Sequence, residues 1–83
     1  MLKILYFASL RETLGRGEES LDLPDGVSDV GGLLQALTAR GGAWETLSVV
    51  KNLRYAVNQE MGRLDSPLKA GDEIAFFPPV TGG

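Results

Sequence analysis

The sequence contains no cysteine and no histidine. Cysteine supplies disulfides and thiolate nucleophiles, histidine is the commonest general base near neutral pH, and both are the usual ligands of zinc. Their absence excludes these chemistries and predicts that the chain holds no metal. Because most enzyme mechanisms lose their usual reagents, the chemistry is expected elsewhere than in a side chain.

Long apolar runs and clustered basic residues are also missing. No hydrophobic stretch approaches the roughly 20 residues that a membrane-spanning helix needs, and the opening segment 1–7 is too short for a secretory signal. The net charge is −3 and the eight Lys and Arg residues are scattered, whereas nucleic-acid phosphates require clustered cations. We therefore expect a cytoplasmic protein with no membrane and no nucleic-acid partner.

Strand-like patterns occur in four segments of this 83-residue chain, over 2–8, 19–23, 54–58 and 73–77. The first carries apolar side chains on both alternating sets, as a central strand does. The turn residues 24–26 close the second. Residues 11–15 are a short helical turn or a loop, so we expect the first two strands to form a hairpin with an irregular connection. Residues 58–62 are interpreted as a turn, and Asp72 and Glu73 as solvated turn residues.

One main helix is expected after Ser28, whose side chain can cap it. Its apolar residues recur at helical spacing and residues 41–42 stop it; they are Val30, Leu33, Leu34 and Leu37. Gly31 and Gly32 each cost up to about 1 kcal/mol against alanine in a helix, so either the helix starts late or its backbone packs closely on something. The pattern over 43–50 favours a short second helix.

The predicted order β, β, α, β, β describes an α+β domain in which one main helix covers one face of a mixed sheet. A right-handed crossover after the helix brings the later strands beside the first. Chains of this length form a single core and leave no room for a second catalytic domain. We place the domain at 1–77 and a flexible C-terminal arm at 78–83.

The arm reads Pro-Pro-Val-Thr-Gly-Gly. Pro78 and Pro79 lack N–H donors and disfavour helix and central strand, so the segment leaves the body of the domain. Six extended residues at ~3.3 Å each reach about 20 Å, enough to enter a pocket in another protein. Gly82 and Gly83 have no side chains, so they form a thin thread that brings a terminal carboxylate down a narrow channel.

A free carboxylate is a poor electrophile, so we expect Gly83 to be adenylated by an ATP-using partner. Attack by a sulfur nucleophile then gives a terminal thiocarboxylate, and sulfur travels without any cysteine in the carrier. The opposing interpretation is a frayed end, because flexible termini with small residues are common. The position of Gly82 and Gly83 directly after a strand and a Pro-Pro pair favours the functional interpretation.

The motifs of the final run are Gly-Asp-Glu at 71–73, Phe-Phe-Pro-Pro-Val at 76–80 and Gly-Gly at 82–83. In these motifs the chain resembles the small, sulfur-carrying subunit of molybdopterin synthase, a member of the ubiquitin-like β-grasp proteins. The segments that also match in place are 3–8, 10–12 and 56–59. The resemblance thus spans nearly the whole chain, although residues 18–53 agree only in pattern.

The resemblance implies a non-catalytic subunit of a heteromeric sulfurtransferase. In that family the terminal glycine, here Gly83, is adenylated by an E1-like enzyme and converted to a thiocarboxylate. It then enters the large synthase subunit, in an expected heterotetramer, and donates sulfur to the cyclic pyranopterin monophosphate precursor during molybdenum cofactor biosynthesis. The chain itself is expected to bind no cofactor, since ATP is used by the activating partner.

The expected site residues form three groups. Gly83 carries the reacting group, and the thread behind it comprises Val80, Thr81 and Gly82. The expected partner-binding residues are Phe77, Pro78, Pro79, Met61 and Arg11. Met61 is either a docking contact or a core residue, and Arg11 either pairs with an acid of the partner or is solvated.

Phe76 and Phe77 are consecutive on a strand and therefore face opposite sides. If Ile74 and Phe76 are the buried pair, Phe77 is a surface aromatic at the root of the arm, of the kind that dominates docking interfaces. The alternative is that Phe77 packs on a second, minor core.

Other functions also stay open. The same activated carboxylate could be attacked by an amine, which would make the chain a protein modifier that is conjugated to lysines. Sulfur carriage for thiamine or tRNA thiolation is a further alternative, although residues 76–81 resemble the molybdopterin branch more closely than the thiamine branch. In a bare interaction domain, removal of Gly82 and Gly83 would leave function intact.

Overall fold

The computed structural model describes residues 1–50 and 53–78. Within these ranges the chain forms a five-stranded sheet with the order β2-β1-β5-β3-β4. Its strands are β1 (Leu2–Tyr6), β2 (Glu18–Leu21), β3 (Arg54–Val57), β4 (Glu60–Met61) and β5 (Glu73–Phe77). β1 and β5 run parallel and the other neighbouring pairs antiparallel. The predicted mixed sheet is confirmed.

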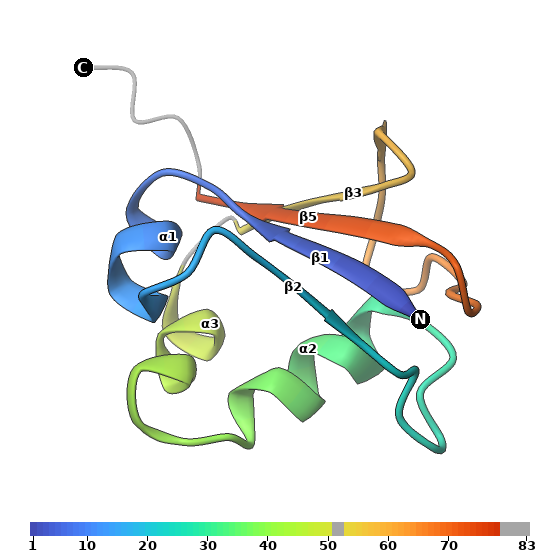
Figure 1. Ribbon diagram of the computed structural model, residues 1–83, viewed down its shortest axis with the longest axis horizontal. Coiled ribbons are helices and arrows are strands. Elements are labelled where there is room, and N and C mark those ends of the chain that lie inside the picture. Colours follow the sequence, from blue (N-terminus) through green and yellow to red (C-terminus); the bar gives the residue numbers. More distant parts are fainter. Residues whose placement is uncertain (51–52, 79–83) are drawn as a thin grey trace.

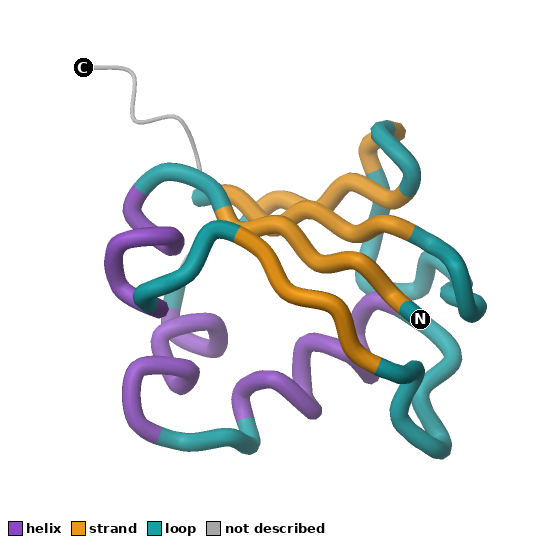
Figure 2. The backbone as a smooth tube through the Cα atoms, in the orientation of Figure 1, coloured by secondary structure: helices purple, strands orange, loops and turns teal. Residues whose placement is uncertain are grey.

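The helices form a second layer against one face of this sheet (Figure 1). The main helix α2 (Val30–Thr38) crosses beneath the strands, and η1 (Gly42–Glu45) and α3 (Thr46–Val49) continue the layer. α1 (Ser9–Leu14) lies in the connection between β1 and β2, at one end of the sheet. Figure 2 shows strands on one side and helices on the other, so the opposite sheet face is free of helices in the described part of the chain. The arrangement is a ubiquitin-like β-grasp fold of the α+β class, as predicted.

The hydrophobic core fills the space between the two layers. Ile4 and Tyr6 of β1 lie beside Ile74 and Phe76 of β5 in the parallel register, and all four are buried. From the helix layer, the core receives Val30, Leu33, Leu37 and Leu47. Full burial of such side chains stabilises a fold by about 1.5–3 kcal/mol each.

None of the helices in residues 1–50 and 53–78 combines the length and the hydrophobicity of a membrane-spanning segment.

The start of α2 differs from the prediction. Asp29, not Ser28, caps the helix: its side chain accepts a hydrogen bond from the Gly32 N–H at 2.8 Å. The helix does not start late, because Val30 is its first residue. The N–H of Gly31 donates to the Leu64 carbonyl at 2.7 Å, and a Cβ on Gly31 would lie 3.2 Å from that oxygen. Close packing therefore explains the glycine at position 31.

The predicted turn over 58–62 contains a further strand, so the prediction of four strands was wrong. Asn58 and Gln59 have positive φ angles of 50° and 70° and turn the chain back tightly. Residues Glu60–Met61 then pair with the end of β3. A strand of this length has too little alternation to be distinguished from a turn in the sequence.

Asp72 was wrongly interpreted as solvated. It is only 6% exposed, and its carboxylate accepts hydrogen bonds from Asn58 Nδ2 at 3.0 Å and from the Lys69 N–H at 2.9 Å. Asn58 also accepts a bond from the Glu73 N–H at 3.0 Å. These bonds, chiefly that from Asn58, lower the pKa of Asp72 although burial opposes its ionisation. The carboxylate therefore joins the start of β5 to the turn between β3 and β4.

Candidate functional site

β5 ends at Phe77, and Pro78 follows it as the last described residue. These two residues form the root of the arm. Ile74 and Phe76 are buried, and Phe77 faces the other side and is half-buried. The ring of Phe77 meets that of Phe7 edge to face, with centroids 6.4 Å apart and planes at 75°. Phe7 is itself 47% exposed. Phe77 therefore combines features of the two predicted alternatives. It lies at the surface at the root of the arm, and it also packs against a second aromatic ring outside the main core.

The strand register extends this contact into an apolar row across the helix-free face. Leu5 pairs with Ala75, Ala75 with Ala56, and Ala56 with Met61. Directly opposed residues of neighbouring strands point to the same face of a sheet. We call this surface the apolar sheet face; it comprises Leu5, Phe7, Ala56, Met61, Ala75 and Phe77. Met61 is 63% exposed on it and is not a core residue.

Arg11 lies elsewhere. It is exposed in α1 and its side chain packs over Gly17, where a Cβ would come within 3.2 Å of Arg11 Nε. The structure thus brings Phe77 and Met61 onto one face and places Arg11 against the loop that leads into β2. The predicted site residues outside the described ranges are Pro79, Val80, Thr81, Gly82 and Gly83.

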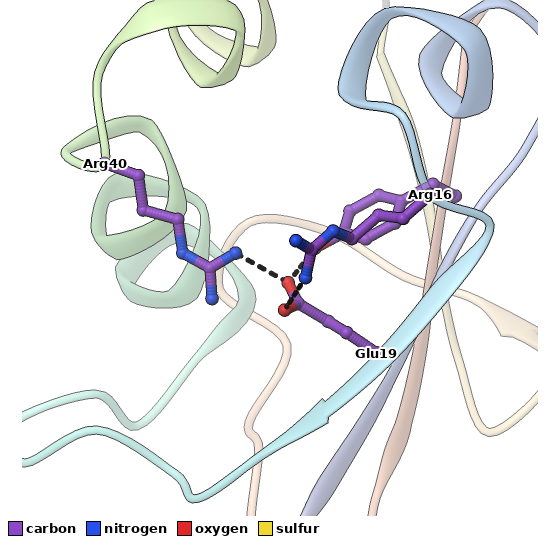
Figure 3. A network of polar contacts seen from close by, with 4 residues as sticks. Arg16, Glu19 and Arg40 are labelled. Carbon is purple, nitrogen blue, oxygen red and sulfur yellow. Dashed lines mark hydrogen bonds and ion pairs between the residues drawn. The ribbon is translucent and has the colours of Figure 1, made fainter.

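A polar cluster on the core side of β2 was missed by the sequence reasoning (Figure 3). Glu19 accepts hydrogen bonds from the Tyr6 hydroxyl at 2.7 Å, from Arg40 at 2.8 Å and from Arg16 at 3.0 Å. The Glu19 side chain is 11% exposed. The Arg40 guanidinium also lies 4.4 Å from the centroid of the Trp44 ring. Arg16 lies three positions before Glu19, but Tyr6 and Arg40 come from separate segments, so local spacing could reveal only one of the three donors.

The protonation states in this cluster follow from its contacts. Burial disfavours the ionised form of Glu19, but the hydrogen bonds from Tyr6 and Arg40 and the two guanidinium charges together lower its pKa. Burial, and then the bond to Glu19, raise the pKa of Tyr6 far above its ordinary value. Glu19 is thus an ion-paired carboxylate and Tyr6 a neutral donor, which gives the cluster a structural role.

Among the described residues, the apolar sheet face is the feature best suited to contact with another protein. Across residues 1–50 and 53–78, no three acidic side chains are grouped so that they could hold a metal ion. The buried carboxylate of Asp72 and the largely covered carboxylate of Glu19 are both engaged in hydrogen bonds. What the fold provides is an exposed apolar surface with an aromatic pair where β5 ends.

The sequence and the fold of the chain are both similar to those of known proteins. The ThiS family model matches residues 4–83. The chain is 42% identical over 85 residues to the molybdopterin synthase sulfur carrier subunit of Escherichia coli and 40% identical over 83 residues to that of Haemophilus influenzae, and both matches cover all of each chain. The crystal structure of SAMP1, small archaeal modifier protein 1 of Haloferax volcanii, is similar with a TM-score of 0.79 and 34% identity, covering 99% of this chain and 98% of that one.

Proposed function

Because this chain belongs to the ThiS family, we propose that it serves as the sulfur-carrier subunit of a molybdopterin synthase. The observation that carries the proposal is the full-length match to two proteins of that name at 40% and 42% identity. The apolar sheet face supports it, because a carrier needs a surface that docks on its partner beside the group that it delivers. Interface centres are apolar and rich in aromatic anchors.

In the proposed cycle the working group is the Gly83 carboxylate. One of its oxygens attacks the α-phosphorus of ATP on an E1-like partner, and pyrophosphate leaves. Hydrosulfide supplied by a donor then attacks the carbonyl carbon of the glycyl adenylate and expels AMP, and loss of the proton on sulfur leaves a thiocarboxylate. The chain supplies the acyl group and its thread, and the partner supplies the nucleotide site.

The loaded arm then enters the large synthase subunit. There the thiocarboxylate sulfur displaces an oxygen substituent from a carbon of the cyclic pyranopterin monophosphate precursor, which links carrier and precursor through a thioester. Water hydrolyses the acyl–sulfur bond, so that the sulfur stays on the precursor and Gly83 regains its carboxylate. The product, molybdopterin, carries its two sulfur atoms as a dithiolene, so two loaded carriers are needed for each molecule of product. A heterotetramer with two small and two large subunits accords with this requirement. The roles of Val80, Thr81 and Gly82 are to span the channel between the docked domain and the precursor.

Reconstitution with the large subunit tests this function. Chain loaded with sulfur, the large subunit and the precursor should together form molybdopterin, whereas a chain without Gly82 and Gly83 should form none. The circular dichroism spectra of the two carriers should agree, because both keep the buried core of the described residues, which extends to Phe76. Equal product from the shortened chain would contradict the proposal and favour a bare interaction domain.

A second candidate is a protein modifier, and the similarity to SAMP1 favours it. Here a lysine amine, and not a sulfur nucleophile, attacks the activated Gly83, and an isopeptide bond forms with loss of AMP. Mass spectrometry of cellular proteins separates the two: a modifier leaves residues 70–83 on target lysines after tryptic digestion, because Lys69 is the last tryptic site of the chain. A carrier accumulates as the free chain with a terminal thiocarboxylate.

A further inference from the structure

Arg54 places a cation beside the root of the arm. The antiparallel register of β3 and β5 sets Arg54 directly opposite Phe77, so the two side chains share the helix-free side of the sheet. Phe77 in turn contacts Phe7. The order across the sheet is therefore Phe7, Phe77, Arg54, and Arg54 is exposed at the border of the apolar sheet face.

No carboxylate of the described ranges 1–50 and 53–78 forms an ion pair with Arg54. The ion pairs found there join Lys3 to Glu18, and both Arg16 and Arg40 to Glu19. On the same face of β5, the acidic residue is Glu73, four positions before Phe77 and so about 13 Å along the strand. The charge of Arg54 is thus directed to solvent.

We propose that Arg54 determines docking specificity by pairing with an Asp or Glu side chain on the large subunit that receives the arm. This inference rests on the proposed function, since a protein that takes the arm must cover Phe77 and with it the neighbouring Arg54. Covering a cation without a counter-charge is unfavourable, whereas a carboxylate pairs with a guanidinium through two parallel hydrogen bonds.

The charge of the whole chain makes this contact selective. The net charge is −3, so most of the surface repels an acidic patch. An acidic residue on the partner is accommodated where the local charge is positive, and Arg54 provides that at the arm. Attraction at one position and repulsion elsewhere orient the partner so that its channel lies over the arm and not over another part of the surface.

The affinity of the full chain for the large subunit from the same organism tests the inference. Isothermal titration calorimetry should give a Kd for Arg54→Glu at least about tenfold weaker than for the unaltered chain at low salt. The difference should shrink as salt is raised, because dissolved ions screen Arg54 in the free chain and weaken its attraction to the partner's carboxylate during association. The Kd for Arg54→Gln should lie between the Kd of the unaltered chain and that of Arg54→Glu, since this variant loses the attraction without adding repulsion.

Arg63→Glu is the matched control. Arg63 is exposed in the loop after β4. It precedes Leu64, whose carbonyl accepts a hydrogen bond from the Gly31 N–H at the start of α2. The substitution changes the net charge equally but leaves the arm root intact, so the Kd should stay within about twofold. Thermal unfolding of each variant verifies that the fold is kept.

The outcomes separate this inference from the function on which it rests. An unchanged Kd for Arg54→Glu, or an equal loss for Arg63→Glu, overturns the role of Arg54 and leaves the carrier function standing. No complex with the unaltered chain overturns both. Recovery of binding by Arg54→Glu when one acidic residue on the large subunit is changed to Lys identifies the paired carboxylate and confirms the inference.

Discussion

Phe7 and Phe77 meet edge to face, with 6.4 Å between their ring centroids. The contact joins the residue that follows β1 to the last residue of β5, so the root of the arm is fixed to the centre of the sheet. Edge-to-face pairs contribute about 0.5–1.5 kcal/mol beyond the area that they bury. The proposed docking surface is therefore preformed in the free chain, which would reduce the entropy lost on association.

Phe77→Ala should weaken binding to the large subunit more than it weakens the fold. Phe77 is half-buried outside the main core, and an aromatic anchor contributes about 2 kcal/mol or more at an interface. Calorimetric titration gives the Kd, and urea unfolding gives the stability. Val49→Ala is the control, because Val49 is 73% exposed in α3 of the helix layer. An unaltered Kd for Phe77→Ala would show that docking uses another face.

Glu19→Gln should lower the free energy of unfolding by about 2 kcal/mol, because Arg16 and Arg40 lose their counter-charge and their charge-assisted bonds. Glu18→Gln is a control on the neighbouring residue. The Glu18 side chain is 66% exposed and lies 3.9 Å from Lys3, so its loss should change stability by less than about 0.5 kcal/mol. Urea denaturation measures both, and equal effects would refute a structural role for the Glu19 cluster.

Stability should fall with acid, and Glu19 should account for part of the fall. Its folded-state pKa is lowered from the ordinary value of 4.5. The stabilisation is therefore present in full above the unfolded pKa and is lost as pH drops through the folded one. Unfolding free energies measured from pH 6 downward, over about three units, should decline less steeply in Glu19→Gln than in the unaltered chain. Identical slopes would contradict the assigned ionisation.

Asp72→Ala should cost about 2 kcal/mol of stability, because Asn58 Nδ2 and the Lys69 N–H lose a buried acceptor. The exposed turn residue Asp25 provides the comparison, and Asp25→Ala should stay within about 0.5 kcal/mol. Chemical denaturation measures both variants. A small effect at position 72 would mean that water replaces the carboxylate there.

Much of the fold could be predicted because it is determined by local patterning. The last strand was predicted over the same residues as β5, since Ile74 and Phe76 alternate and the turn before them contains glycine. The cap of α2 was misassigned to Ser28 because Ser28 and Asp29 are adjacent and both suitable. The choice is tertiary: the Leu68 N–H donates to the Ser28 carbonyl at 2.9 Å and the Val30 N–H donates to the Ser66 carbonyl at 3.1 Å. These backbone bonds fix where the chain enters the helix, and Asp29 then occupies the N-cap position.

The candidate site was predicted less completely. Phe77 and Met61 share a face only because the register joins Ala56 to both β5 and β4, and a register is not visible in one sequence. Glu19 was missed because two of its three donors, Tyr6 and Arg40, lie in distant segments. The reacting role of Gly83 stays a prediction, because that residue lies outside the described ranges.

The central claim is that Gly83 carries sulfur, and the intact mass of the chain tests it most directly. The chain is incubated with its adenylating partner, ATP and a sulfur donor. The mass should rise by the difference between one sulfur and one oxygen, and fragmentation should locate the change at Gly83. Because the chain has no cysteine, a persulfide cannot produce a gain in sulfur. An unchanged mass with a partner that forms the glycyl adenylate, or sulfur found at another residue, would contradict the account.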